Sequence, residues 1–141
     1  MKTLKHPNVI RFIGMCYDSN MDLLMALEFA NNGSLDKYLK RHNDFSMNLI
    51  AIICYQIAQG MEYLSKILVH RDLAARNILL SSENSAKIGD FGLSRLMSNS
   101  QYYQASTKER LPLRWYSPEA LEKGKTIKVI NKSCFFCIII H

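Results

Sequence analysis

The sequence predicts an α+β fold in which short β-hairpins accompany one long amphipathic helix. Two apolar runs rich in β-forming residues, 9–17 and 23–30, are separated by a turn-like segment and predict a hairpin. Residues 78–80 and 86–88 flank a polar turn and predict a second hairpin. Between the hairpins, apolar residues recur at three- and four-residue spacing, which is typical of a helix with one buried face: Ile50, Ile53, Ile57, Met61 and Leu64.

Polar residues indicate where the helices begin. Ser34 follows an Asn-Asn-Gly break and is expected to cap a short helix that reaches residue 40. Asp36 lies in the first turn of that helix, where a negative charge favours the helix dipole. Ser46 is expected to cap the long helix, whose pattern spans about 20 residues.

The composition is that of a globular domain. With 141 residues, 48% apolar and 21% charged, the chain is long enough to bury one core. The net charge of +6 is spread along the chain, so we expect no nucleic-acid binding. The four cysteines form no disulfide framework and fit reduced thiols. No apolar run approaches the ~20 residues of a membrane span, and no signal peptide is recognised, so we expect a cytoplasmic protein.

The octapeptide at residues 70–77, His-Arg-Asp-Leu-Ala-Ala-Arg-Asn, carries the main functional signal. It separates Asp72 from Asn77 by five positions. Phosphoryl transfer needs such a set, because a carboxylate orients the attacking hydroxyl, an amide oxygen binds Mg²⁺ and a cation holds the loop. Asp-Phe-Gly at residues 90–92 and Ser-Pro-Glu at residues 117–119 follow in order. Three ordered motifs make a chance match a poor explanation.

With these motifs the chain resembles a protein kinase. The resemblance implies a truncated protein-kinase-like fold: small-lobe strands four and five, the hinge, and the first part of the mainly helical large lobe through the activation segment. Leu27 falls at the gatekeeper position, although a plain core role fits it equally well from the residues alone. Glu28 and Ala30 fall on the hinge that binds adenine, and Leu79 falls beneath the adenine ring.

The resemblance also implies the chemistry. Asp72 would accept the proton of the substrate hydroxyl, or at least orient that hydroxyl, and Arg76 would supply a supporting cation. Asn77 and Asp90 would hold Mg²⁺ against the phosphates of ATP, because a hard cation prefers oxygen ligands. ATP and Mg²⁺ are therefore the implied cofactors.

Residues within and after the loop resemble a tyrosine kinase specifically. Ala74 occupies the place where serine/threonine kinases usually carry a lysine, and the cation comes later, at Arg76. A tyrosine hydroxyl lies further from its backbone than a serine hydroxyl, so the cation must approach from another position. Pro112 and Trp115 resemble the platform for the substrate residue after the target. The implied partners are protein substrates bearing tyrosine.

Two adjacent tyrosines, Tyr102 and Tyr103, lie in the activation segment and resemble autophosphorylation sites, against the alternative of ordinary surface residues. Arg71 and Arg95 are the residues expected to bind a phosphate there. The tyrosine pair and the segment 115–119 look most like the spleen tyrosine kinase group of non-receptor kinases, but receptor and Janus kinases also carry such pairs. A receptor parent would put the chain on the cytoplasmic side of a membrane.

The resemblance covers residues 1–125, which we expect to be a partial kinase domain. The 141 residues contain no glycine-rich phosphate loop, and residues 126–141 match no kinase element. We expect that tail to be a truncation or gene-model artefact. Cys134 and Cys137 form a lone CxxC pair, which does not favour a zinc site.

Three functions therefore compete. The first is a tyrosine kinase that transfers the γ-phosphoryl group of ATP, with the isolated chain itself inactive. The second is an inactive kinase fragment that acts only as a binding or regulatory piece, because the phosphate clamp is missing. The third is a nucleic-acid binder, which the dispersed charge does not favour.

Overall fold

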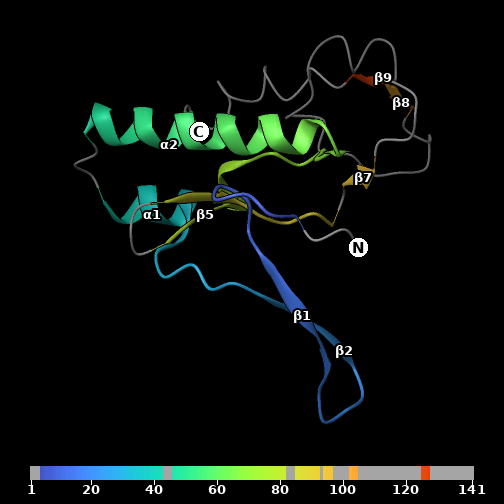
Figure 1. Cartoon of the computed structure of the whole chain (residues 1–141). Helices are drawn as coiled ribbons and strands as arrows, with labels where there is room; N and C mark the ends of the chain where they lie inside the picture. Colours follow the sequence, from blue (N-terminus) through green and yellow to red (C-terminus); the bar gives the residue numbers. More distant parts are fainter. Residues whose placement is uncertain are drawn as a thin grey trace.

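The computed structural model describes residues 4–42, 46–81, 85–92, 94–96, 102–104 and 125–127. Short strands precede and follow two consecutive α-helices along these ranges, as expected for an α+β fold (Figure 1). Their order is β1 Phe12–Tyr17, β2 Leu23–Leu27, β3 Gly33–Ser34, α1 Leu35–Arg41, α2 Met47–Ser65, β4 Leu68–Val69, the 3-10 helix η1 Ala75–Asn77, β5 Ile78–Leu80, β6 Ala86–Ile88, β7 Arg95–Leu96, β8 Tyr102–Gln104 and β9 Lys125–Ile127.

The first predicted hairpin forms, but its strands are shorter than the two apolar runs. β1 and β2 pair antiparallel, with Tyr17 opposite Leu23 beside the turn. The turn is held by Asp18, whose Oδ1 accepts hydrogen bonds from the backbone N–H groups of Asn20 and Asp22, at 2.8 Å each. These side-chain hydrogen bonds stabilise the turn, which contains no glycine.

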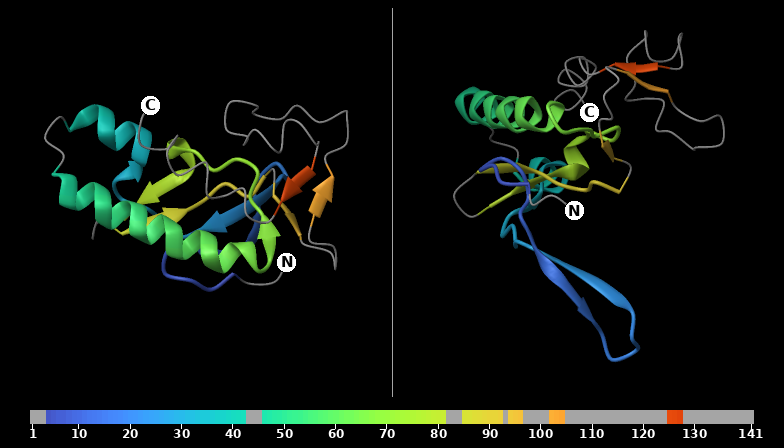
Figure 2. Two further views of the ribbon diagram at one scale, coloured as in Figure 1. Left: turned by 90° about the horizontal axis from the view of Figure 1, so that it is seen from above. Right: turned by 45° about the vertical axis from the view of Figure 1, so that its right-hand side comes forward.

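The hairpin extends away from the rest of the molecule, as Figure 1 and the right-hand view of Figure 2 show. The first residues of the 9–17 run lie outside the hairpin and pack on the rest of the molecule, where Val9 forms an isolated parallel bridge to Ile88. Much of the hairpin's apolar surface is exposed, and the large exposed side chains are Ile13, Met15, Tyr17, Met21, Leu23, Leu24, Met25 and Leu27.

The second predicted hairpin is confirmed as β5 and β6, which pair antiparallel with Ile78 opposite Ile88. β3 adds a third strand to this sheet, with Gly33 opposite Leu80. Two further strand pairs form, since β7 pairs with β4 and β8 pairs with β9. These short pairings join segments far apart in sequence, so no local sequence pattern predicts them.

The long helix is confirmed as α2, with 19 residues, and the Ser46 Oγ accepts the predicted capping bond from the Leu49 N–H at 3.2 Å. The expected capping bond of Ser34 is wrong, because its side chain bonds no helix N–H. Ser34 is still paired in β3, opposite Leu79, when α1 begins. The chain therefore enters this helix directly from a strand.

The core lies where α2 covers the β5–β6 strands. Four of the five predicted stripe residues are buried there, and Ile50 is half-buried near the start of the helix. The buried apolar cluster consists of Val9, Leu35, Ile53, Ile57, Met61, Leu64, Leu68, Leu73, Ile78, Leu80, Ala86 and Ile88.

Within the described ranges, no helix is long and apolar enough to cross a membrane. Cys16 and Cys54 are free cysteines, which fits the expectation of reduced thiols. Cys134 and Cys137 lie outside the described residues.

Gly60 should be essential for the packing of α2, because a Cβ there would lie 2.7 Å from the Asn8 carbonyl oxygen and 2.8 Å from Ile88 Cδ1. Alanine is the better helix former by about 1 kcal/mol. We nevertheless expect Gly60→Ala to lower the free energy of unfolding by about 1–3 kcal/mol, as overpacking does. Urea denaturation followed by circular dichroism measures the change. Gly14→Ala is the control, since nothing lies within 4 Å of its added Cβ; equal effects would contradict the close approach.

Candidate active site

The 70–77 loop starts from a buried histidine. His70 directly follows β4 and has 0% of its surface exposed. Its Nδ1 accepts a hydrogen bond from the Asp72 backbone N–H at 3.3 Å, and its Nε2 lies 3.0 Å from the Gly89 carbonyl oxygen. Because Nδ1 is the acceptor, the ring proton is on Nε2 and is donated to Gly89. His70 thus joins the backbone of Asp72 to the residue before Asp90.

The surroundings of His70 favour its neutral form. Burial lowers the pKa of His70 below its ordinary value of 6.5, because the imidazolium loses its hydration in the interior. The bond to Gly89 and the carboxylates of Asp72 and Asp90 raise the pKa, but they do not overcome the effect of burial. The neutral ring is also the form that its two hydrogen bonds require.

We expect the protein to lose stability as the pH falls below about 6.5. The pKa of His70 is lower in the folded chain, so the unfolded chain binds more protons between the two pKa values. As the pH falls through this range, the free energy of unfolding should decrease by up to about 1.4 kcal/mol per pH unit. Above pH 6.5 the neutral His70 contributes its full share to the stability. Urea denaturation at several pH values measures the slope. His70→Gln cannot titrate and should have a flatter profile; an unchanged slope would contradict the assignment.

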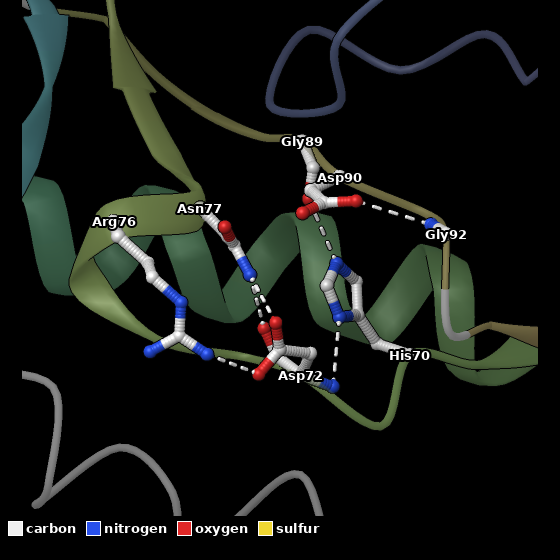
Figure 3. Close-up of polar contacts among 7 residues, drawn as sticks. All are labelled: His70, Asp72, Arg76, Asn77, Gly89, Asp90 and Gly92. Atoms are coloured by element: carbon white, nitrogen blue, oxygen red, sulfur yellow. Dashed lines mark hydrogen bonds and ion pairs between the residues drawn. The ribbon is translucent and has the colours of Figure 1, made fainter. Parts of the chain in front are cut away.

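Asp72 is the centre of a polar network (Figure 3). Its Oδ1 accepts from Arg76 Nη2 at 2.5 Å, and its Oδ2 accepts from Asn77 Nδ2 at 2.8 Å. The same amide nitrogen donates to the Asp72 carbonyl oxygen at 2.7 Å. The Asp72 side chain is 10% exposed and that of Arg76 is 47% exposed, so the guanidinium forms the solvent side of the network. The three predicted residues are therefore brought together.

Asn77 and Asp90 are linked through the backbone. The Gly89 N–H donates to the Asn77 carbonyl oxygen at 2.8 Å, which holds the segment before Asp90 against η1. The Asn77 amide nitrogen bonds Asp72, so its amide oxygen is turned away from that carboxylate, as Figure 3 shows. Asp90 Oδ1 accepts from the Gly92 N–H at 3.1 Å, and the residue is otherwise exposed. Two oxygen donors are thus available from neighbouring segments.

The Asn77 amide oxygen and the Asp90 carboxylate fit a Mg²⁺ ion whose remaining ligands come from the substrate or from water. An amide oxygen and a carboxylate suit a hard cation that keeps several outside ligands. Among the described residues, no group of three or more His, Cys, Asp or Glu side chains gathers to hold a metal by itself. The two protein ligands therefore need phosphate or water oxygens to complete a site.

Backbone strain marks both edges of the network. Arg71 has φ of 68° and Asp90 has φ of 56°, in the left-handed region that non-glycine residues rarely adopt. Such positions persist where the surroundings over-determine them, and they cluster at functional sites. At Asp90 the bond from the Gly92 N–H supports the strained conformation.

A pocket of about 560 Å³ lies beside Asp90. Its walls are mainly apolar and come from the hairpin, from residues around β4 and from the 90–94 segment, with Phe12, Leu27 and Phe91 among them. Leu27 is 39% exposed, so it belongs to this wall and not to the buried core. Phe91 packs on His70, with ring centroids 5.3 Å apart and ring planes tilted by 58°.

Of the other residues expected to bind nucleotide, Glu28 and Ala30 lie just after β2 at the base of the hairpin, whereas Leu79 lies in β5. The Glu28 backbone N–H donates to the Arg11 carbonyl oxygen at 2.9 Å, and the Ala30 carbonyl oxygen accepts from the Gly33 N–H at 3.1 Å. Leu79 is half-buried in β5, against Gly89. Their roles in nucleotide binding stay predictions.

The expected regulatory residues are described only in part. Arg71 directly precedes Asp72 and is buried, with 6% exposed, and Arg95 lies in β7 opposite Val69. Tyr102 and Tyr103 lie in β8, paired with β9. Pro112 and Trp115 lie outside the described residues.

Sequence reasoning missed two residues that organise this site. Gly89 uses both of its backbone groups, one toward His70 and one toward Asn77. Lys87 forms an ion pair with Glu28 at 3.1 Å. The position of Gly89 directly before Asp-Phe-Gly was the available signal, whereas nothing local to Lys87 indicates its distant partner.

Comparison with known proteins decides the family. The family model of protein tyrosine and serine/threonine kinases matches residues 1–135. The chain belongs to this family. The truncated kinase-like α+β fold is therefore confirmed, while the domain boundary expected at residue 125 stays a prediction.

One relative of this kinase segment is the Discoidin domain-containing receptor tyrosine kinase B of Caenorhabditis elegans. The two are 40% identical over 124 residues, which cover 87% of this chain and 15% of the relative. The chain thus spans a small part of the length of the curated relative that it matches. The match does not distinguish the spleen tyrosine kinase group from other tyrosine kinases.

Proposed function

We propose that this chain is part of a protein tyrosine kinase that transfers the γ-phosphoryl group of ATP to tyrosine in protein substrates. The observation that supports it most is the bonded set of Asp72, Arg76 and Asn77. The Gly89–Asn77 backbone bond adds Asp90 to this set. Family membership and a relative whose printed name is that of a tyrosine kinase agree with this reading.

In the proposed reaction, Asp72 orients the tyrosine hydroxyl and takes its proton. Its carboxylate is already fixed by Arg76 and Asn77, so little reorganisation accompanies the reaction. The partly exposed Arg76 guanidinium lies where it can stabilise negative charge on the transferred group. This preorganised charge is the main contribution that the chain makes to catalysis.

Asn77 and Asp90 are the proposed Mg²⁺ ligands, and a bound Mg²⁺ would neutralise charge on the β- and γ-phosphates. Glu28 and Ala30 are proposed to bind adenine through backbone groups, with Leu27 beside the base and Leu79 beneath it. The half-buried and partly exposed apolar surfaces of Leu79 and Leu27 support this arrangement.

Asp72→Asn in the full-length protein should lower the rate of tyrosine phosphorylation at least 100-fold. The amide cannot take a proton and loses its charge against Arg76, and general-base positioning is typically worth about 10²–10⁴ in rate. Nucleotide affinity should stay within about threefold, because Asp72 is not among the proposed nucleotide ligands. A radiolabelled phosphate-transfer assay and a separate nucleotide titration measure the two quantities.

The control is Asp22→Asn in the exposed turn of the hairpin, which should leave both quantities unchanged. Full activity in Asp72→Asn would remove Asp72 from the mechanism. The same assay on residues 1–141 alone tests the second candidate, a binding or regulatory fragment. That candidate is favoured by the lack of a glycine-rich phosphate loop within these 141 residues. Asp72-dependent transfer by residues 1–141 would reject it.

The finer assignment rests on the sequence motifs. The tyrosine pair at 102–103 and the segment 115–119 support the spleen tyrosine kinase group, and we propose Pro112 and Trp115 as its substrate platform. The relative's printed name is that of a receptor. We propose that this segment works on the cytoplasmic side of any membrane to which the parent protein is attached, where ATP is available.

We also propose that Tyr102 and Tyr103 are autophosphorylation sites, with the phosphates bound by Arg71 and Arg95. Charge-assisted bonds of about 1.5–3 kcal/mol each are enough to shift a two-state segment tenfold or more. In the full-length protein preincubated with ATP, the double change Tyr102→Phe with Tyr103→Phe should lower kcat at least threefold. Tyr55→Phe is the matched control, because Tyr55 lies on α2 with 65% of its surface exposed. Equal activity of all three proteins would make the pair ordinary surface residues.

A further inference from the structure

Ser94 closes the turn that follows Asp90-Phe91-Gly92. Its backbone N–H donates a hydrogen bond to the Phe91 carbonyl oxygen at 3.0 Å, and its Oγ donates to the same oxygen at 2.7 Å. A carbonyl oxygen has two lone pairs, so it can accept both bonds. The backbone bond is open to any residue at this position except proline, whereas the second bond requires a hydroxyl group. The identity of residue 94 therefore decides how firmly the Phe91 carbonyl is held.

The Phe91 carbonyl is linked to Asp90 through a single peptide plane. The Phe91 C=O and the Gly92 N–H belong to one peptide unit, which stays planar because its C–N bond has partial double-bond character. The Gly92 N–H donates to Asp90 Oδ1 at 3.1 Å, as Figure 3 shows. A donor that fixes the carbonyl end of this plane also fixes the N–H end, since the two groups rotate together. Ser94 thus influences the Asp90 carboxylate through the backbone.

The turn starts from a strained residue. Asp90 has φ of 56°, in the left-handed region that costs free energy for residues other than glycine. On its upstream side the chain is held by the two backbone bonds of Gly89. On its downstream side the support comes from the Gly92 N–H and from the turn that Ser94 closes. Each of these downstream bonds therefore offsets part of the strain and favours the observed conformation.

The Ser94 bond lies in a partly buried environment. Ser94 lines the apolar pocket together with Leu68 and Phe91, so water competes less for its hydroxyl than at an exposed site. A chemically similar bond exists at the exposed end of α2, where Ser65 Oγ donates to the Glu62 carbonyl oxygen at 2.8 Å. Both bonds join a serine to the carbonyl group three residues earlier, and they differ in their surroundings. Ser65 is therefore a matched control for Ser94.

We propose that Ser94 is a positioning residue that orients the Asp90 carboxylate for Mg²⁺ through the Phe91–Gly92 peptide plane. This role rests on the proposed kinase function, since it presumes that Asp90 is a ligand of Mg²⁺. Phe91 is held at two points, by its ring on His70 and by its carbonyl group on Ser94. Loss of the hydroxyl lets the plane rotate more freely, so a smaller fraction of molecules presents the carboxylate in the binding orientation. The Mg²⁺ concentration that the protein requires should rise as this fraction falls.

Hydrogen exchange of the 141-residue chain tests the structural part without any assumption about activity. Ser94→Ala removes the hydroxyl and keeps the backbone N–H, so the protection factor of the Gly92 amide should fall at least threefold. Ser94→Thr keeps a hydroxyl and should stay within twofold of wild type. Ser65→Ala removes the similar bond on α2 and should leave the Gly92 amide unchanged. Equal protection of Gly92 in Ser94→Ala and wild type would overturn the proposal.

A Mg²⁺ titration of phosphate transfer by the full-length protein, at saturating ATP, tests the functional part. Ser94→Ala should raise the Mg²⁺ concentration for the half-maximal rate at least threefold, and Ser94→Thr should restore it. The rate at saturating Mg²⁺ should stay within twofold, because Asp72 is fixed by its own bonds to Arg76 and Asn77. Ser65→Ala should match wild type in both quantities.

Two kinetic results would overturn the proposal. Lower protection of Gly92 with an unchanged Mg²⁺ requirement would reduce Ser94 to a structural residue. A lower rate at saturating Mg²⁺ with an unchanged requirement would place its effect on phosphoryl transfer instead. Failure of the wild-type protein to transfer phosphate would reject the kinase function itself, and the exchange experiment would still decide whether Ser94 fixes the peptide plane.

Discussion

The candidate site depends on the two backbone groups of Gly89. The Gly89 carbonyl oxygen accepts from His70 Nε2 at 3.0 Å, and its N–H donates to the Asn77 carbonyl oxygen at 2.8 Å. These bonds join the two ends of the 70–77 loop to the residue before Asp90. An added Cβ at Gly89 would lie 3.2 Å from Leu79 Cδ1, so the strand leaves little room for a side chain there. The arrangement fixes Asp72, Asn77 and Asp90 relative to one another with few side-chain contacts.

The apolar core makes the hydrogen bonds between Gly89, His70 and Asn77 rigid. His70 is fully buried, yet both of its ring nitrogens have partners, so burial costs less than it would for an unpaired group. The same burial lowers the pKa of His70 and keeps the ring in the neutral form that the two bonds need. α2 supplies the support, since Gly60 lets the helix lie close to Asn8 and Ile88. Packing, protonation state and site geometry are therefore parts of one arrangement.

Features determined by nearby residues could be predicted from the sequence. The stripe from Ile53 to Leu64 defines α2, and the spacing of Asp72 and Asn77 identified a loop whose members do bond one another. The kinase family followed from motif order and is confirmed. The left-handed backbone at Arg71 and Asp90 could not be predicted, because residues other than glycine rarely adopt it. The Lys87–Glu28 pair could not be predicted either, since its members are far apart in sequence and are brought together only by the path of the folded chain.

The hairpin shows why contacts at its base matter so much. A two-stranded ribbon is at best marginally stable alone, and β1–β2 exposes large side chains such as Met15 and Tyr17, each with more than half of its surface in solvent. Burial of the ribbon therefore contributes little to its orientation. Its direction is set where it joins the body, by the Ile10 N–H to Ile88 carbonyl bond at 2.9 Å and by the contacts of Lys87. Both anchor points lie on β6, so the strand that leads to Asp90 is also the strand that orients the hairpin.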